Sequence, residues 1–170
     1  MLYDCEIMSG TIVNEADIDV KSVIGEHTDG NSDEDVQSLS IRNKAHYHMP
    51  HDIEDYFENL VCLDIFKVQL QEIHQEDLER FPGLKYLSLA DNLITVLDRY
   101  LFKNNLDLEV IQLRDNKIKF VNQAFVDLKK LHHLDFKRNE CHSGFAANSK
   151  SAVNVLIKHI YSNCKMPNQI

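Results

Sequence analysis

Apolar residues recur along this chain at a long, fixed period that a single helix or strand would not produce. The segments 60–65, 84–89, 108–113 and 131–136 each carry apolar residues at their first, fourth and sixth positions. The first residues of these segments lie 24, 24 and 23 positions apart. One such unit cannot bury its own apolar face, so successive units must stack to form a shared core. The pattern therefore predicts a solenoid of stacked strands.

Each unit continues with the same order of apolar and polar positions. Positions 4 to 6 alternate as in a short strand whose apolar side chains face inward. Asparagine occupies position 9 at Asn92, Asn116 and Asn139, where its side chain can bond backbone groups of a turn. Asn105 is expected to be an exposed loop residue. Apolar residues also recur at two later positions and in the return segment of each unit. They are Leu70, Ile94, Ile118 and Cys141 at position 11, Ile73, Leu97 and Val121 at position 14, and Leu78, Phe81, Leu101, Phe102, Phe125 and Leu128 in the return segments.

A degraded unit precedes these four and begins at Val36. Lys44 stands where asparagine is expected, and Val68 replaces it in the next unit. Terminal repeats are often atypical because they also cap the stack. The loss of two successive asparagines predicts a less regular ladder at the N-terminal end.

These units follow the form L-x-x-L-x-L-x-x-N-x-I-x-x-I-x-x-x-x-F-x-x-L. From Val36 to Cys164, about three quarters of the chain, the sequence resembles secreted, extracellular-type leucine-rich-repeat proteins, particularly small ones of insects. The resemblance implies an α/β fold: a right-handed leucine-rich-repeat solenoid with a curved parallel sheet of about five strands. An N-terminal β cap (1–35), the repeats (36–140) and a C-terminal helical cap (141–170) would follow in order.

The C-terminal segment reads as a helix over 151–162. Val153, Leu156, Ile157 and Ile160 share one face, and Ser149 or Ser151 is the candidate N-cap. A helix that ends in Cys164 and covers Cys141 resembles the C-terminal flanking cap of extracellular family members. The resemblance implies a Cys141–Cys164 disulfide. The alternative is two buried thiols in a cytosolic protein.

The other two cysteines leave their pairing open. Cys62 lies at a strand position that points to the concave surface, and Cys5 lies in an expected cap strand from Leu2 to Met8. The insect proteins that the chain resembles usually have two cysteines in this cap that bond each other. Here the cap contains only Cys5. Its partner has been lost from the N-terminus, or Cys5 is a free thiol, or it bonds Cys62 across the first repeat.

Location follows from the cap and from what the chain lacks. Residues 1–20 form no long apolar run, and no segment of 18 apolar residues occurs, so we expect no secretory signal and no membrane span. The sequence is interpreted as the mature chain of an extracellular protein with an added start methionine. A cytoplasmic protein is the alternative.

Charge is divided unevenly along the chain. Residues 1–60 contain 14 acidic and 3 basic side chains, a net charge of −11, whereas the remainder contains 13 and 15, a net charge of +2. Nucleic-acid binding requires a basic stripe, so the overall charge of −9 argues against it.

No motif predicts catalysis. The five glycines form no phosphate-binding loop, and neither a G-x-S-x-G nor an H-E-x-x-H motif occurs, so we expect no enzyme activity and no cofactor. His46, His48 and His51 could bind zinc or copper, which leaves metal binding as an alternative function. No carboxylate or thiol completes a tetrahedral set there, so the sequence predicts no metal site.

The surface left for function is the concave face, where positions 3, 5 and 7 of each unit project side by side at a spacing of about 4.8 Å. Phe66, Tyr86 and Val110 form an apolar centre with arginines at its rim, a composition typical of protein interfaces. We therefore expect a protein ligand or receptor as partner, in extracellular or innate-immune recognition by analogy, with the chain itself a monomer or weak dimer. An intracellular scaffold is the rival function. The candidate partner-binding residues are Arg42, Asp64, Phe66, Tyr86, Ser88, Gln112, Arg114, His133, Asp135 and Lys137.

Overall fold

A computed structural model describes residues 36–42, 47–49, 53, 55 and 57–166, and the backbone of two short strands nearer the N-terminus. Those two strands, β1 (Thr11–Ile12) and β2 (Val23–Ile24), pair antiparallel. The expected cap strand from Leu2 to Met8 lies outside the described residues.

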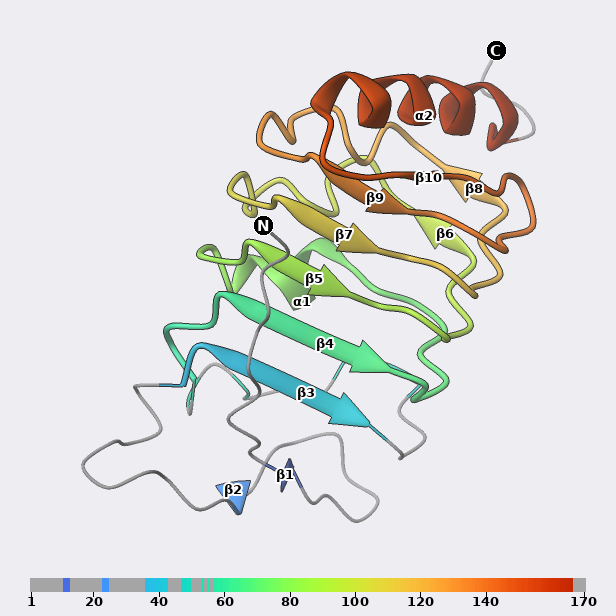
Figure 1. Ribbon diagram of the computed structural model, residues 1–170. Coiled ribbons are helices and arrows are strands. Elements are labelled where there is room, and N and C mark those ends of the chain that lie inside the picture. Colours follow the sequence, from blue (N-terminus) through green and yellow to red (C-terminus); the bar gives the residue numbers. More distant parts are fainter. Residues whose placement is uncertain are drawn as a thin grey trace.

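The repeats stack into one sheet of parallel strands (Figure 1). Its parallel members are β3 (Ser38–Arg42), β4 (Cys62–Phe66), β5 (Tyr86–Ser88), β7 (Val110–Gln112) and β9 (His133–Asp135). The register joins equivalent positions, so that Leu63 pairs with Leu87, which pairs with Ile111. The predicted solenoid with a parallel sheet is confirmed.

Four elements add to the predicted architecture. Strand β10 (Phe145–Ala146) pairs antiparallel with β9 and becomes the last strand of the sheet. On the return side, β6 (Val96–Leu97) and β8 (Phe120–Val121) form a small parallel sheet, and α1 (Gln75–Glu79) is a short helix. The two N-terminal strands of the sheet, β3 and β4, pair over five residues. The expectation of a less regular ladder at the missing asparagines stays a prediction in part, because the turn around Lys44 lies outside the described residues.

The core lies between the sheet and the return segments. Leu78, Phe102 and Phe125 are buried at equivalent places in successive units, and the rings of Phe102 and Phe125 stack with centroids 5.8 Å apart. Leucine and isoleucine side chains at positions 4 and 6 of the units, with Phe136 in the last unit, fill the other side of this core. Each unit therefore buries its apolar face only against its neighbours, as a solenoid requires.

The asparagine ladder forms as the repeat predicts. The side-chain oxygen of Asn92 accepts hydrogen bonds from the backbone N–H groups of Val68 and Leu70, each at 3.1 Å. Asn92 thereby bonds the turn of the preceding unit, in which Val68 replaces the asparagine. Asn116 and Asn139 repeat the arrangement, accepting from Ile94 and Ile118 and donating to carbonyls of the preceding strands. The side chains of Asn92 and Asn116 are buried, and that of Asn139 is half-buried.

Helix α2 (Lys150–Asn163) covers the end of the stack (Figure 1). Ser149 is its N-cap and accepts a hydrogen bond from the backbone N–H of Ala152. Val153, Leu156 and Ile160 are buried against the last repeat.

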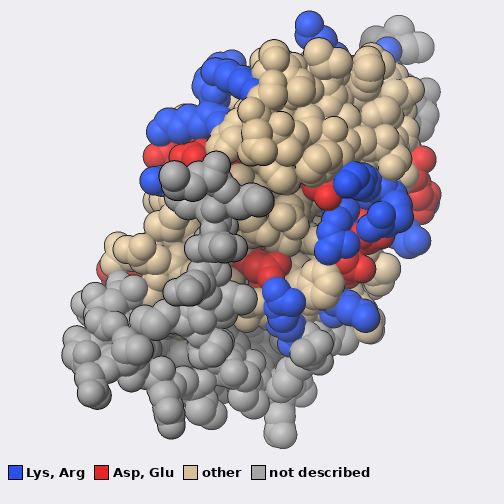
Figure 2. All heavy atoms as spheres, viewed as in Figure 1, with Lys and Arg blue, Asp and Glu red and all other residues tan. Residues whose placement is uncertain are grey.

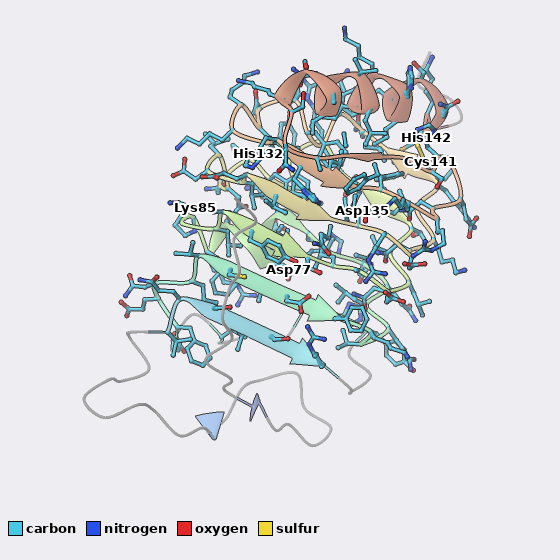
Figure 3. All side chains as sticks on the ribbon, viewed as in Figure 1. Asp77, Lys85, His132, Asp135, Cys141 and His142 are labelled. Carbon is cyan, nitrogen blue, oxygen red and sulfur yellow. A yellow bond between two sulfur atoms is a disulfide. The ribbon has the colours of Figure 1, made fainter. Side chains whose placement is uncertain are left out.

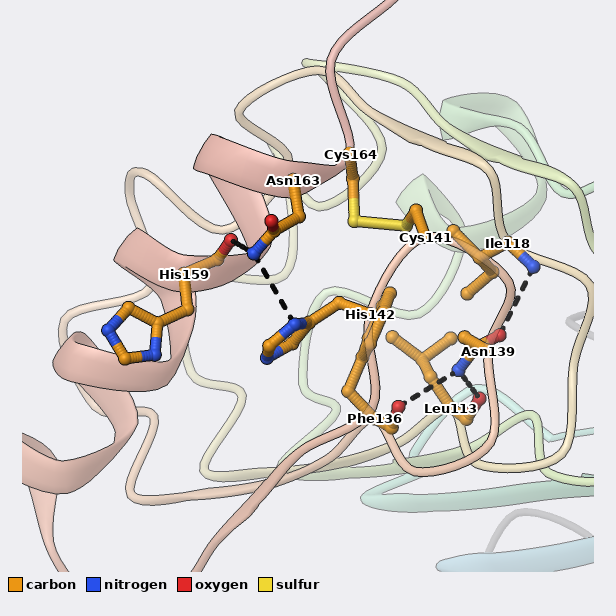
Figure 4. Close-up of a disulfide and its surroundings, with 9 residues drawn as sticks. All are labelled: Leu113, Ile118, Phe136, Asn139, Cys141, His142, His159, Asn163 and Cys164. Atoms are coloured by element: carbon orange, nitrogen blue, oxygen red, sulfur yellow. Dashed lines mark hydrogen bonds between the residues drawn. A yellow bond between two sulfur atoms is a disulfide. The ribbon is translucent and has the colours of Figure 1, made fainter.

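A disulfide between Cys141 and Cys164 joins this helix to the last repeat (Figure 4), with their Cα atoms 5.1 Å apart. The backbone continues the connection, because the N–H of Val121 donates to the carbonyl of Cys164 at 2.8 Å. The helical cap is thus fixed to two successive units at its C-terminal end.

Candidate functional site

The sheet register places the candidate residues in rows across one face. One row runs through Ser38, Cys62, Tyr86, Val110 and His133, and the next through Ser40, Asp64, Ser88, Gln112 and Asp135. A third row runs along the carboxyl ends of the strands and contains Arg42, Phe66, Ala90, Arg114 and Lys137. Figure 3 displays the side chains of this face, with Asp135 labelled on β9.

Phe66 is the centre of an aromatic and cationic cluster on this face. Its ring is partly exposed, and the guanidinium carbon of Arg42 lies 5.1 Å from the ring centroid. Arg114, two strands away, places its guanidinium carbon 5.9 Å from the same centroid. Ala90 lies between them in the row and carries only a methyl group, so Arg114 can extend across β5 to the ring. We name Phe66, Arg42 and Arg114 the Phe66 cluster.

Carboxylates of the same face hold these arginines in place. Arg42 forms an ion pair with Asp64 and donates a hydrogen bond to Ser40 at 2.7 Å. Arg114 contacts Asp91 at 3.1 Å and Asp115 at 2.8 Å. These ion pairs therefore fix the orientation of both guanidinium groups on the face.

The ion pairs extend along the turns to the last repeat. Arg138 pairs with Asp115 through two hydrogen bonds. The bond from Arg138 lowers the pKa of the Asp115 carboxyl, and the bond from Arg114 adds to this, while burial opposes both. In Figure 2, basic and acidic side chains gather at the side of the molecule where the strands end.

A second cluster occupies the C-terminal end of the face. Phe145 on β10 pairs with Asp135 and is 46% exposed, so its ring extends the second row by one strand. The ammonium nitrogen of Lys137 lies 4.1 Å from the centroid of this ring, and the imidazole of His133 meets it edge-on at 5.3 Å. We name Phe145, Lys137 and His133 the Phe145 cluster.

The charge of His133 is set by its surroundings. Burial lowers the pKa of the imidazole, the Asp135 carboxylate opposes this, and the charges of His132 and Lys137 add to the lowering. At neutral pH the Phe145 cluster therefore carries its positive charge on Lys137.

The structure separates the candidate residues into accessible and covered ones. The exposed or half-buried ones are Arg42, Asp64, Phe66, Tyr86, Gln112, Arg114, His133 and Lys137. Ser88 and Asp135 are buried, at 2% and 8% exposure, and a carboxylate oxygen of Asp135 accepts from the backbone N–H of Lys137 at 3.1 Å. Neighbouring side chains therefore cover Ser88 and Asp135, which leaves little of their surface available for contact with a partner. Cys62, expected on the concave surface, is also buried.

Phe145 is the residue of this face that the repeat pattern missed. It follows the last repeat, where the spacing ends, and only the antiparallel return of β10 brings it beside β9. An isolated phenylalanine in a polar stretch of the cap was the available signal.

The histidine alternative rests on residues that the structure places only in part. His46 and His51 lie outside the described residues. His48 is exposed and contacts Glu72 at 2.9 Å, and His74 approaches the other oxygen of the same carboxylate at 3.6 Å. Among the described residues, no group of three or more histidine, cysteine or acidic side chains could hold a metal ion.

Comparison with known proteins agrees with the architecture. Residues 82–140 match the leucine rich repeat family model, and no curated protein matches the sequence. Similar solved structures include the Toll–Spatzle complex, a molecular hub in Drosophila development and innate immunity, with 22% identity and a TM-score of 0.58. That match covers 63% of this chain and 14% of that chain.

Two further structures share the fold. The APL1 leucine-rich repeat domain has 18% identity and a TM-score of 0.58, with 78% of this chain and 34% of that chain covered. The TLR13–ssRNA13 complex has 20% identity and a TM-score of 0.53, with 63% and 19% covered.

The similarity at these identities defines the fold and leaves the function to be argued from the site. The protein has the fold of a leucine-rich-repeat solenoid, and it spans at most about a third of the length of the chains that it resembles. Within the described part of the chain, neither helix is long and apolar enough to cross a membrane.

Proposed function

We propose that this protein is a non-enzymatic recognition module that binds a protein partner through the concave strand face. The Phe66 cluster carries the proposal, because it presents a partly exposed ring between two arginines that carboxylates hold in place. Aromatic residues and arginine dominate the residues that contribute most to binding at protein interfaces. Tyr86 and Gln112 on the neighbouring strands would extend the contact surface.

The comparisons are compatible with more than one class of partner. Two of the similar structures are complexes, one of Toll with Spatzle and one of TLR13 with a single-stranded RNA. The negative charge that argues against nucleic acid belongs to residues 1–60, while the remaining residues carry a net charge of +2. The net charge of residues 61–170 therefore favours neither a protein nor a nucleic acid as the ligand. The aromatic and arginine composition of the Phe66 cluster favours a protein.

An extracellular, innate-immune setting is the proposed context. The Cys141–Cys164 disulfide supports it, because disulfides persist in oxidising compartments. The rival is an intracellular scaffold with reduced cysteines. The intact mass of protein purified without reductant decides between them: a gain of two hydrogens on reduction favours the extracellular protein, and no change favours the scaffold.

Recognition through this face is tested by capture with matched baits. Wild-type protein, a Phe66→Ala variant and a Tyr100→Ala variant would be cross-linked in the native fluid and their partners compared by mass spectrometry. Tyr100 is the control because it is also an exposed ring, flanked by Arg99 and Lys103 in a return segment. A partner lost only by Phe66→Ala supports the proposal. Equal capture by all three baits contradicts it.

A further inference from the structure

We propose that the partner surface is acidic and that it contacts both ends of the concave face, with Lys137 of the Phe145 cluster selecting its charge. The inference rests on the proposed function and adds the chemistry of the partner. Four strand spacings separate β4 from β10, so the two aromatic rings lie roughly 19 Å apart across the sheet.

In two ion pairs of this face the basic side chain is more exposed than its carboxylate, although the formal charges of the face are nearly balanced. The side chain of Arg42 is 45% exposed and that of its partner Asp64 is 17% exposed. Arg138 is 61% exposed, against 22% for Asp115. At these two pairs the carboxylate lies beneath the guanidinium group, so a partner that approaches Arg42 or Arg138 meets a cation first, whereas the side chains of Arg114 and Asp91 are equally exposed at 32%. Such a surface attracts acidic groups and repels basic ones.

Lys137 differs from the arginines of this face in its contacts with carboxylates. Arg42, Arg114 and Arg138 each contact a carboxylate of this chain, whereas among the described residues Lys137 forms no ion pair. Its ammonium group lies over the ring of Phe145, and the ring holds the charge at a fixed place on the surface. An ammonium group has three donors, so those not directed at the ring can bind a carboxylate of the partner.

The rings determine which partner groups fit. The faces of both rings are already approached by cations of this chain, so a partner cation would meet repulsion at either cluster. A carboxylate beside an apolar side chain fits each cluster instead, with the carboxylate on the cation and the apolar group on the exposed edge of the ring. The polar strip between the clusters includes Gln112, which can bond to a peptide backbone.

The test uses a random twelve-residue peptide display library as the probe and the full chain as the target. Peptides selected on wild-type protein should carry an excess of Asp and Glu, and the affinity of the best one should fall as salt rises. Lys137→Gln should weaken that peptide by about fivefold or more, because one charge-assisted contact is lost, and Lys137→Arg should restore it.

Lys103→Gln provides the matched control, since Lys103 also places its ammonium near a ring, that of Tyr100, at 5.9 Å in a return segment. Thermal melting of every variant verifies folding. Neutral or basic peptides that bind through Phe66 would overturn the acidic partner while the proposed function survives. Equal losses of peptide affinity in the Lys137→Gln and Lys103→Gln variants would also overturn the acidic partner.

Two further outcomes separate the remaining possibilities. Peptides whose binding is unchanged by both Phe66→Ala and Phe145→Ala would overturn the proposed function together with the inference. The second outcome is that no acidic peptide is selected, while a single-stranded RNA oligomer binds wild-type protein and binds the Lys137→Gln variant more weakly. This result would indicate that the exposed cations of the face bind nucleic acid, and it would overturn the acidic protein partner.

Discussion

Single asparagines hold the turns of this solenoid, and their value depends on burial. Asn116 is 2% exposed and joins two units: it accepts from the N–H of Ile94 and donates to the carbonyl of Leu89 in the preceding unit, and it donates to the carbonyl of Leu113 in its own unit. Asn116→Ala would leave buried backbone groups without partners and should lower the free energy of unfolding by about 1–3 kcal/mol. Urea denaturation measures this loss.

The control for this prediction depends on which neighbouring asparagine is exposed. Asn105, expected at the surface, is fully buried and donates to the carbonyls of Leu78 and Phe81 at 2.9 and 2.8 Å. Asn105→Ala should therefore destabilise the protein as Asn116→Ala does. Asn104 is exposed, and Asn104→Ala is the proper control. Equal stabilities of the Asn104 and Asn116 variants would show that the ladder contributes nothing.

At the scale of elements, the C-terminal cap depends on a covalent link. The Cys141–Cys164 bridge closes a loop of 23 residues in sequence separation between the last repeat and the end of α2. In the chain-entropy model such a loop contributes about 3 kcal/mol, so the double variant Cys141→Ala, Cys164→Ala should melt markedly lower. Hydrogen exchange should show the loss first in α2. An unchanged melting temperature would contradict the expectation that the bridge holds the cap.

The same helix makes the cap sensitive to alkaline pH. Tyr161 stacks on Phe125 with centroids 6.4 Å apart, and its hydroxyl oxygen accepts a hydrogen bond from the N–H of Phe125 at 2.9 Å. Burial raises the pKa of Tyr161 from 10.0 to about 12, while the hydrogen bond from Phe125 opposes the rise.

The sign of the pH effect follows from which state ionises first. The unfolded tyrosine loses its proton near pH 10 and the folded one near 12, so the stabilising contribution is complete below pH 10 and is lost as pH rises toward 12. Melting curves across this range should show that loss, and Tyr161→Phe should reduce it. A Tyr161→Phe variant with the wild-type slope would assign the alkaline sensitivity to other groups.

For the whole molecule, the repeat spacing determines most of the architecture and part of the site. The period placed the five parallel strands, the asparagine ladder and the rows of the concave face, because each depends on residues within one or two units. Phe145 and β10 could not be placed, since they follow the last repeat and their position depends on how the cap returns over β9. The burial of Ser88 and Asp135 was missed for a related reason: projecting from a strand does not determine how far neighbouring side chains cover a residue.

The proposed function assigns recognition to the strand face and stability to the core, and two phenylalanines test that division. Phe81 is 1% exposed in the core, so Phe81→Ala would open a cavity and should cost about 3–5 kcal/mol of unfolding free energy. Phe66 is partly exposed on the strand face and loses mainly its contacts with Arg42 and Arg114. Phe66→Ala should therefore cost about 1 kcal/mol or less of stability while weakening partner binding by about 2 kcal/mol or more. Urea denaturation and binding titrations on both variants check this, and a Phe66→Ala variant destabilised as much as Phe81→Ala would make Phe66 a structural residue.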